Sequence, residues 1–198
     1  MSSSPWDNSR ALLSGNPRAR PSPKQSLREG DAVAVAGSGI DRARELTLYS
    51  QGPGCVVAVS GRCMIHVCVN RATSTTISLV RRALADLAER YDTFGFLCVI
   101  EQGAPITLPA DLRESVNAYV RRYSPRFSGA AIVFEAPGFQ ATVVRSLVTA
   151  VNLASRASHP TKVFGDLRTG CNWLCRLTPG EPTAPRLFEL TNQLRKTE

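Results

Sequence analysis

Short apolar runs suited to β-strands alternate with stretches of helical periodicity from residue 46 to residue 177, and this order limits the fold more than any other feature. Two runs rich in small and β-branched residues, Cys55–Ser60 and Met64–Val69, are separated only by Gly61-Arg62. Together with the short alternating segment Leu46–Ser50, they predict that a sheet opens with antiparallel hairpins.

The remainder of this region repeats a helix and a strand. We expect Ser74 or Thr75 to cap the first helix and Asp166 to cap the last one before residue 178. Gly95–Ile100 and Ala130–Phe134 are continuous apolar runs, which are typical of strands covered on both faces. The other predicted elements are a helix that opens at Pro109, a helix over Phe139–Ala154 and a short strand over Lys162–Phe164. We therefore predict an α/β fold with a single mixed β-sheet that opens with antiparallel hairpins and has helices packed on it.

Three regions are predicted along the chain. Residues 1–45 are rich in Ser, Pro and Arg and lack an apolar period, so we expect a disordered or weakly ordered arm. Residues 46–178 form the α/β domain, and residues 179–198 combine a Pro-rich spacer with a short amphipathic helix over Arg186–Arg195. Alone, that helix is too short to be stable in water, so it docks either on the same domain or on a partner. The sequence has no apolar stretch long enough for a membrane helix or a signal peptide, and we expect a cytoplasmic protein.

Basic residues outnumber acidic ones and give a formal net charge of +8, with Arg far more frequent than Lys. Two basic clusters lie in the predicted helices: Arg81 with Arg82, and Arg121 and Arg122 with Arg126. Such a surface favours an anionic partner. Aromatic residues interleaved for base stacking are absent from these clusters, so specific nucleic-acid binding is not expected. An Arg-rich proteome explains the same excess without any function.

Few residues are candidates for chemistry. His66 and Cys68 are two apart in a predicted strand and share one face, which makes them the only local base–nucleophile pair, although packing alone also explains them. Glu101 and Glu135 follow two predicted strands, at the ends where ligands of open α/β sheets gather. We assign Glu101, Gln102 and Glu135, together with the five clustered arginines, to a candidate binding surface.

Two further patterns are incomplete. Cys171 and Cys175 are four apart, and with His159 they supply fewer ligands than the four of a structural zinc site. Gly37-Ser38-Gly39 is similar to the start of a dinucleotide-binding turn, but Arg42 stands where the third glycine is needed. We therefore predict no catalytic residue, no metal site and no cofactor, and expect the cysteines to be reduced and buried.

The segment from Leu46 to Leu177 resembles the STAS superfamily, and within it the bacterial STAS-like (SpoIIAA-like) branch. The matching features are the opening hairpins, the order of helices and strands, and Lys162-Val163-Phe164 followed by Trp173-Leu174. The resemblance implies a small non-catalytic module that binds a protein partner or a small anionic or lipid-like ligand. Members switched by phosphorylation carry Asp-Ser-Ser or Asp-Ser-Thr before a helix. Residues 100–107 lack that motif, and we expect Thr107 there to cap the helix.

Three hypotheses for function follow. The first is a regulatory or scaffolding module that acts by protein–protein binding. The second is a binder or sensor of an anionic lipid or small metabolite, and the third is a small enzyme or nucleotide binder that uses the C-terminal ends of the strands. The oligomeric state stays open. A deep cavity in which a histidine or cysteine meets a second polar side chain would argue against the first hypothesis.

Overall fold

The computed structural model describes residues 33–34, 46–52, 54–105, 107–135 and 138–196. Its centre is a sheet whose strands lie side by side in the order of the sequence. β1 to β4 pair antiparallel, whereas β4 to β7 pair parallel. The strands are β1 (Val33–Ala34), β2 (Leu46–Gly52), β3 (Cys55–Ser60), β4 (Cys63–Cys68), β5 (Phe94–Ile100), β6 (Phe127–Phe134) and β7 (Thr161–Phe164). The predicted mixed sheet with opening hairpins is confirmed.

The hairpin between β3 and β4 turns on Gly61 and Arg62, with Ser60 paired to Cys63. Gly61 has a φ of +50°, which glycine adopts without a steric penalty. A side chain would not fit there, because a Cβ atom would lie 2.2 Å from the carbonyl oxygen of Glu181. The backbone N–H of Arg62 donates a hydrogen bond to the same oxygen at 2.9 Å. The turn therefore holds the segment that leads to the last helix.

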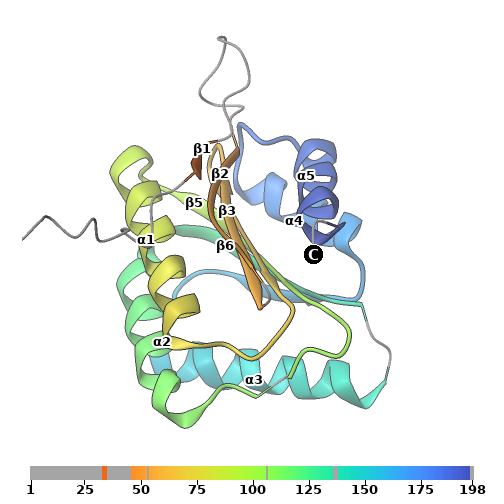
Figure 1. Cartoon of the computed structure of the whole chain (residues 1–198). Coiled ribbons are helices and arrows are strands. Elements are labelled where there is room, and N and C mark those ends of the chain that lie inside the picture. Colours follow the sequence, from red (N-terminus) through yellow and green to blue (C-terminus); the bar gives the residue numbers. More distant parts are fainter. Residues whose placement is uncertain (1–32, 35–45, 53, 106, 136–137, 197–198) are drawn as a thin grey trace, which may run out of the picture.

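Helices cover both faces of the sheet (Figure 1). In the part of the chain that the structure describes, they are α1 (Ser74–Arg90), α2 (Ala110–Tyr123), α3 (Phe139–Ser155), α4 (Leu167–Leu177) and α5 (Ala184–Lys196), with a short 3₁₀ turn at Ser124–Arg126. α1, α2 and α3 each connect two parallel strands that are neighbours in the sheet. Right-handed crossovers that advance across a sheet in one direction place their helices on one face. The opposite face is covered by α4 and α5, which follow the last strand (Figure 1).

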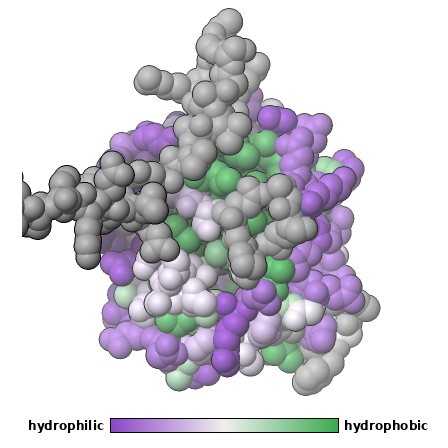
Figure 2. All heavy atoms as spheres, viewed as in Figure 1, coloured by the Kyte–Doolittle hydropathy of each residue, from purple (hydrophilic) through white to green (hydrophobic). Residues whose placement is uncertain are grey.

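Side chains alternate between the two faces along the central strands. In β4, Ile65 and Val67 face α4 and α5, whereas His66 and Cys68 face the side of α1, α2 and α3. The layer beneath α4 and α5 is densely packed, and Leu174 at its centre is fully buried. Figure 2 shows hydrophilic side chains along both sides of the molecule and hydrophobic ones near the middle of the view.

Helix caps agree with the sequence in part. Asp166 caps α4 as predicted, because its carboxylate accepts a hydrogen bond from the backbone N–H three residues later at 2.7 Å. α1 is capped one residue earlier than expected, by Thr73, whose hydroxyl accepts from the N–H of Thr76 at 3.1 Å. Thr107 does not cap α2: the N-cap position is Pro109, and no side chain caps that helix.

The predicted arm contributes one short strand to the sheet, and the predicted C-terminal helix packs on the domain. Of the predicted arm over residues 1–45, β1 pairs with β2 at the edge of the sheet. The other residues of that arm, including Gly37-Ser38-Gly39, lie outside the described residues. At the other end, α5 docks on the same domain, where Leu187, Leu190 and Leu194 are buried in the apolar cluster that also contains α4. No described helix has the length and apolar character needed to cross a membrane.

Candidate functional site

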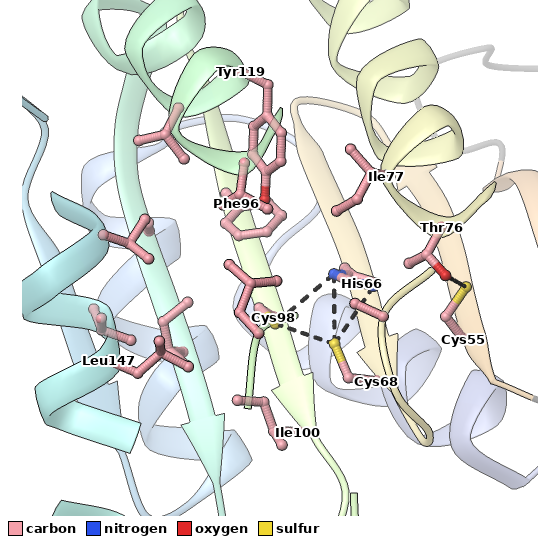
Figure 3. A pocket seen from close by; sticks show the side chains of 18 of the residues that line it. Cys55, His66, Cys68, Thr76, Ile77, Phe96, Cys98, Ile100, Tyr119 and Leu147 are labelled. Carbon is pink, nitrogen blue, oxygen red and sulfur yellow. Dashed lines mark hydrogen bonds between the residues drawn. The ribbon is translucent and has the colours of Figure 1, made fainter. Parts of the chain in front are cut away.

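A cavity of about 200 Å³ lies between the sheet and helices α1, α2 and α3 (Figure 3). Strands β3 to β7 form its floor, and the three helices form its walls. Its lining is mainly aliphatic and aromatic, with Ile77, Phe96, Ile100, Ala130, Ile132, Leu147, Val148 and Val151 among the contributors. The described residues that line it include no Asp, Glu, Lys or Arg. The cavity therefore suits a neutral, apolar molecule better than an anion.

Three sulfur and nitrogen side chains meet on the floor of this cavity. His66 and Cys98 are direct partners across β4 and β5, and Cys68 lies two residues beyond His66 on the same face. The Sγ atom of Cys68 lies 3.5 Å and 3.6 Å from the two ring nitrogens of His66 and 3.7 Å from the Sγ atom of Cys98. The distance from Cys98 Sγ to His66 Nδ1 is 3.9 Å. We refer to His66, Cys68 and Cys98 as the floor cluster.

Further polar groups line the cavity on α1, α2, β3 and β7. Tyr119 extends from α2 with its hydroxyl directed into the cavity (Figure 3). On the other side of His66, the Cys55 thiol lies 3.5 Å from the Thr76 hydroxyl. Thr161 also lines the cavity, and its hydroxyl oxygen is buried without a hydrogen-bond partner among the described residues. A buried hydroxyl without a partner costs free energy, so this atom favours a polar group of a bound molecule beside it.

Burial and mutual contact shift the pKa values of these groups. The hydrogen bond with Cys98, and then burial, raise the pKa of the Cys68 thiol. Burial lowers the pKa of His66, but the negative charge of a Cys68 thiolate and hydrogen bonds with Cys55 and Cys68 outweigh this and raise it to about 10. The imidazolium of His66 therefore depends on a thiolate beside it. Burial raises the pKa of Tyr119, so its hydroxyl keeps its proton at neutral pH.

The sequence identified only two members of the floor cluster. The alternation of β4 correctly predicts His66 and Cys68 on one face, whereas the apolar run around Cys98 predicts only a packing role for that residue. It comes from a different strand, and only the register between β4 and β5 brings it opposite His66. A cavity in which a histidine meets cysteine side chains is also the arrangement that argues against the first hypothesis, a module that acts only by protein–protein binding.

The cysteine and histidine residues considered for a partial metal site are not assembled. Cys171 and Cys175 lie on α4, on the opposite face of the sheet, where burial raises the pKa of Cys171 to about 12. His159 is instead hydrogen-bonded to Ser124, with 2.8 Å between its Nδ1 atom and the serine Oγ atom, and it packs edge-on against Phe127. Within the described ranges, the floor cluster is the group of three or more potential ligands that lies close enough to hold one ion.

The two glutamates of the candidate binding surface do lie at adjacent strand ends, as predicted. Arg195 of α5 binds both of them: its guanidinium bonds to both carboxylate oxygens of Glu101 and donates to Glu135 at 2.9 Å. Glu135 also accepts a hydrogen bond from the backbone N–H of Leu167 at 3.1 Å. These acids therefore anchor α5 and the start of α4. Gln102 lies in an exposed turn beside Glu101.

The basic residues are only partly brought together. Arg81, Arg82 and Arg122 line a groove between α1 and α2, where Asp111 and Glu114 also lie. The groove therefore carries both signs of charge and is not a uniform anion site.

The other two arginines of the clusters lie apart from that groove. Arg126 donates to the backbone carbonyls of Tyr91 at 2.6 Å and Asp92 at 3.1 Å, which ties the end of α2 to the loop before β5. Arg121 is exposed on the last turn of α2. A single basic surface formed by all five arginines is therefore not present.

Comparison of the chain with protein-family models, with curated proteins and with solved structures gave no match. The resemblance to the STAS superfamily accordingly stays a prediction.

Proposed function

We propose that this chain is a binding module for a small, neutral, apolar molecule, held in the cavity between the sheet and helices α1, α2 and α3. The observation that carries the proposal is the cavity, with its apolar walls and a small number of polar groups on its strands and helices. Ligand sites of proteins have this character. A dry apolar cavity of about 150 Å³ already accepts benzene, so a cavity of this size fits one ring or a medium-length alkyl chain.

The chemistry of the lining favours a neutral, apolar ligand over the anionic ligand that the sequence offered as one hypothesis. No Asp, Glu, Lys or Arg is among the described residues that line the cavity, and His66, its one basic side chain, is held charged only by a thiolate beside it. The raised pKa of the Cys68 thiol keeps its proton, so His66 lacks the thiolate that would charge it, and an anion placed there would lose its hydration without gaining a cation, which costs several kcal/mol or more. The protein-binding hypothesis and the STAS resemblance remain predictions. We prefer the ligand-binding hypothesis because it assigns a role to the cavity and its polar groups.

Thermal unfolding of the full chain with two matched probes tests the proposal. We expect 1-octanol to raise the melting temperature, whereas octanoate, which has the same chain length and carries a charge, has a smaller effect. A ligand at one hundred times its Kd stabilises a protein by about 2.7 kcal/mol. Replacing Leu147, which lines the cavity, by tryptophan should abolish the octanol shift.

The control is Leu153→Trp, on the same helix at a side chain that is 79% exposed and does not line the cavity. This variant should respond to octanol like the unmodified chain. Equal responses of the two tryptophan variants, or no response of the unmodified chain, would contradict the proposal. A larger shift with octanoate that weakens with salt would favour the anionic ligand instead.

A further inference from the structure

We propose that His66, Cys68 and Cys98 bind one Zn²⁺ ion on the floor of the cavity, with one coordination position left open toward the cavity. This inference does not depend on binding of an apolar molecule.

Two adjacent parallel strands hold the three side chains on one face. His66 and Cys98 are register partners, and Cys68 follows His66 by two residues, so backbone pairing brings all three to the same side of the sheet. His66 and Cys98 are buried, and Cys68 is partly buried. A site built on two central strands is preorganised, because the strands are held by neighbours on both sides.

The distances match the edges of a metal coordination tetrahedron. Zinc binds sulfur at about 2.3 Å and imidazole nitrogen at about 2.0–2.1 Å. Tetrahedral angles then separate two sulfur ligands by about 3.8 Å, and a sulfur from a nitrogen by about 3.5 Å. The observed separations are 3.7 Å between Cys68 Sγ and Cys98 Sγ, and 3.6 Å and 3.9 Å from these sulfurs to His66 Nδ1. Because Cys68 Sγ also lies 3.5 Å from Nε2, an ion with Nδ1 as its nitrogen ligand requires the imidazole ring to turn about its Cβ–Cγ bond, whereas the sulfur–sulfur separation already fits.

The kind of ligand selects the kind of metal. Two thiolates and one imidazole suit zinc, which is borderline soft, and do not suit Mg²⁺ or Ca²⁺, which prefer oxygen. A ligand histidine usually has a hydrogen-bond partner that sets its orientation. Here Cys55 and Thr76 line the cavity together with His66, and the Cys55 thiol lies 3.5 Å from the Thr76 hydroxyl.

Three protein ligands distinguish this site from a structural zinc site. Structural sites have four protein ligands, whereas sites with three keep a position for water or for another molecule. The fourth direction here faces the cavity, into which Tyr119 points its hydroxyl (Figure 3). The open position would hold water or a donor atom of a bound molecule, and Tyr119 supplies a hydrogen-bond donor beside it.

Titration with Co²⁺, which replaces Zn²⁺ and is coloured, tests the site. The full chain is prepared with reductant and treated with chelator, and six free thiols are confirmed after denaturation, since all six cysteines are free in the structure. We expect one equivalent of Co²⁺ to give a near-ultraviolet sulfur-to-cobalt charge-transfer band and intense visible bands of a tetrahedral ion. One equivalent of Zn²⁺ should remove them.

Variants then locate the ion. Cys98→Ser and Cys68→Ser, tested separately, should each lower Zn²⁺ affinity by at least about 100-fold, because loss of an outer hydrogen-bond partner alone costs 10- to 100-fold. Cys175→Ser is the matched control, a partly buried thiol on the opposite face, and should keep one equivalent. Tyr119→Phe should also keep the ion, because its hydroxyl is not one of the three ligands.

Three results would overturn the proposal: no stoichiometric Co²⁺ binding by the reduced chain, unchanged binding in both floor-cluster variants, or loss of binding in Cys175→Ser. Circular dichroism of each variant shows whether it is folded, and the spectrum of the unmodified chain is decisive even if one variant unfolds. The chelated chain is also tested with 1-octanol. Binding of octanol without metal, or of metal without an octanol response, separates the two proposals.

Discussion

At the scale of single residues, the tightest constraint is Gly61 in the turn between β3 and β4. Its φ is +50°, and a Cβ atom would lie 2.2 Å from the carbonyl oxygen of Glu181. Gly103 also has a positive φ, +95°, but nothing lies within 4 Å of the position of its Cβ atom. Gly103→Ala should therefore cost about 1–2 kcal/mol of backbone strain. Gly61→Ala should cost about 1–3 kcal/mol more, because a backbone carbonyl must move. Urea unfolding of both variants measures the difference, and equal costs would show that the close approach is unimportant.

The same scale shows how far a site can be derived from sequence. The alternation of β4 was enough to place His66 and Cys68 together, because strand side chains repeat with a period of two. Cys98 could not be added, because its position depends on the register between two parallel strands joined through a helix. Register between such strands is set by packing of the whole layer and has no local signal comparable to a hairpin turn. The cavity was unpredictable for a related reason, since it depends on how closely three helices approach the sheet.

At the scale of elements, Arg195 fastens α5 to the carboxyl ends of two strands. It binds Glu101 and Glu135, and its own pKa is raised, first by the hydrogen bond with Glu101. Because the pairs are partly exposed, Arg195→Ala should destabilise the chain by only about 1 kcal/mol. Amide hydrogen exchange in α5 should nevertheless become faster. The control is Arg186→Ala in the same helix, whose pair with Glu189 is largely exposed and should contribute less than about 0.5 kcal/mol. Equal exchange in the two variants would contradict an anchoring role for Arg195.

Sequence periodicity predicts helix α5 but not the surface against which it packs. The spacing of Leu187, Leu190 and Leu194 indicated a helix with one apolar side, and the structure buries that side on the sheet. Both a partner and the same domain could have covered it, because periodicity shows that a face must be buried and does not show against what. The acids at the two strand ends were correctly placed, but Arg195 lies 94 residues from Glu101, and no local pattern connects them.

At the scale of the molecule, the two layers of the sheet differ in how completely they are filled. The order of elements accounts for the layers: α1, α2 and α3 cross between successive parallel strands and share one face, so the last two helices must cover the other. Fully buried side chains pack on both faces, beneath α4 and α5 and beneath α1, and the cavity lies on the second of these faces. The cavity therefore lies beside a packed region of the same layer, as expected because binding sites are seldom optimised for stability.

The last prediction compares the two layers with the same substitution. Leu174 is fully buried beneath α4, so Leu174→Ala should lower the free energy of unfolding by about 2–5 kcal/mol, as expected for a cavity made in a packed core. Leu147 is partly exposed and already borders empty space, so Leu147→Ala removes fewer contacts and should cost about 1 kcal/mol. Urea unfolding measures both, and the slope with denaturant should be unchanged if each variant keeps the fold. If Leu147→Ala were as costly as Leu174→Ala, the cavity wall would be part of the stabilising core, and its role as a site for a ligand would lose its physical basis.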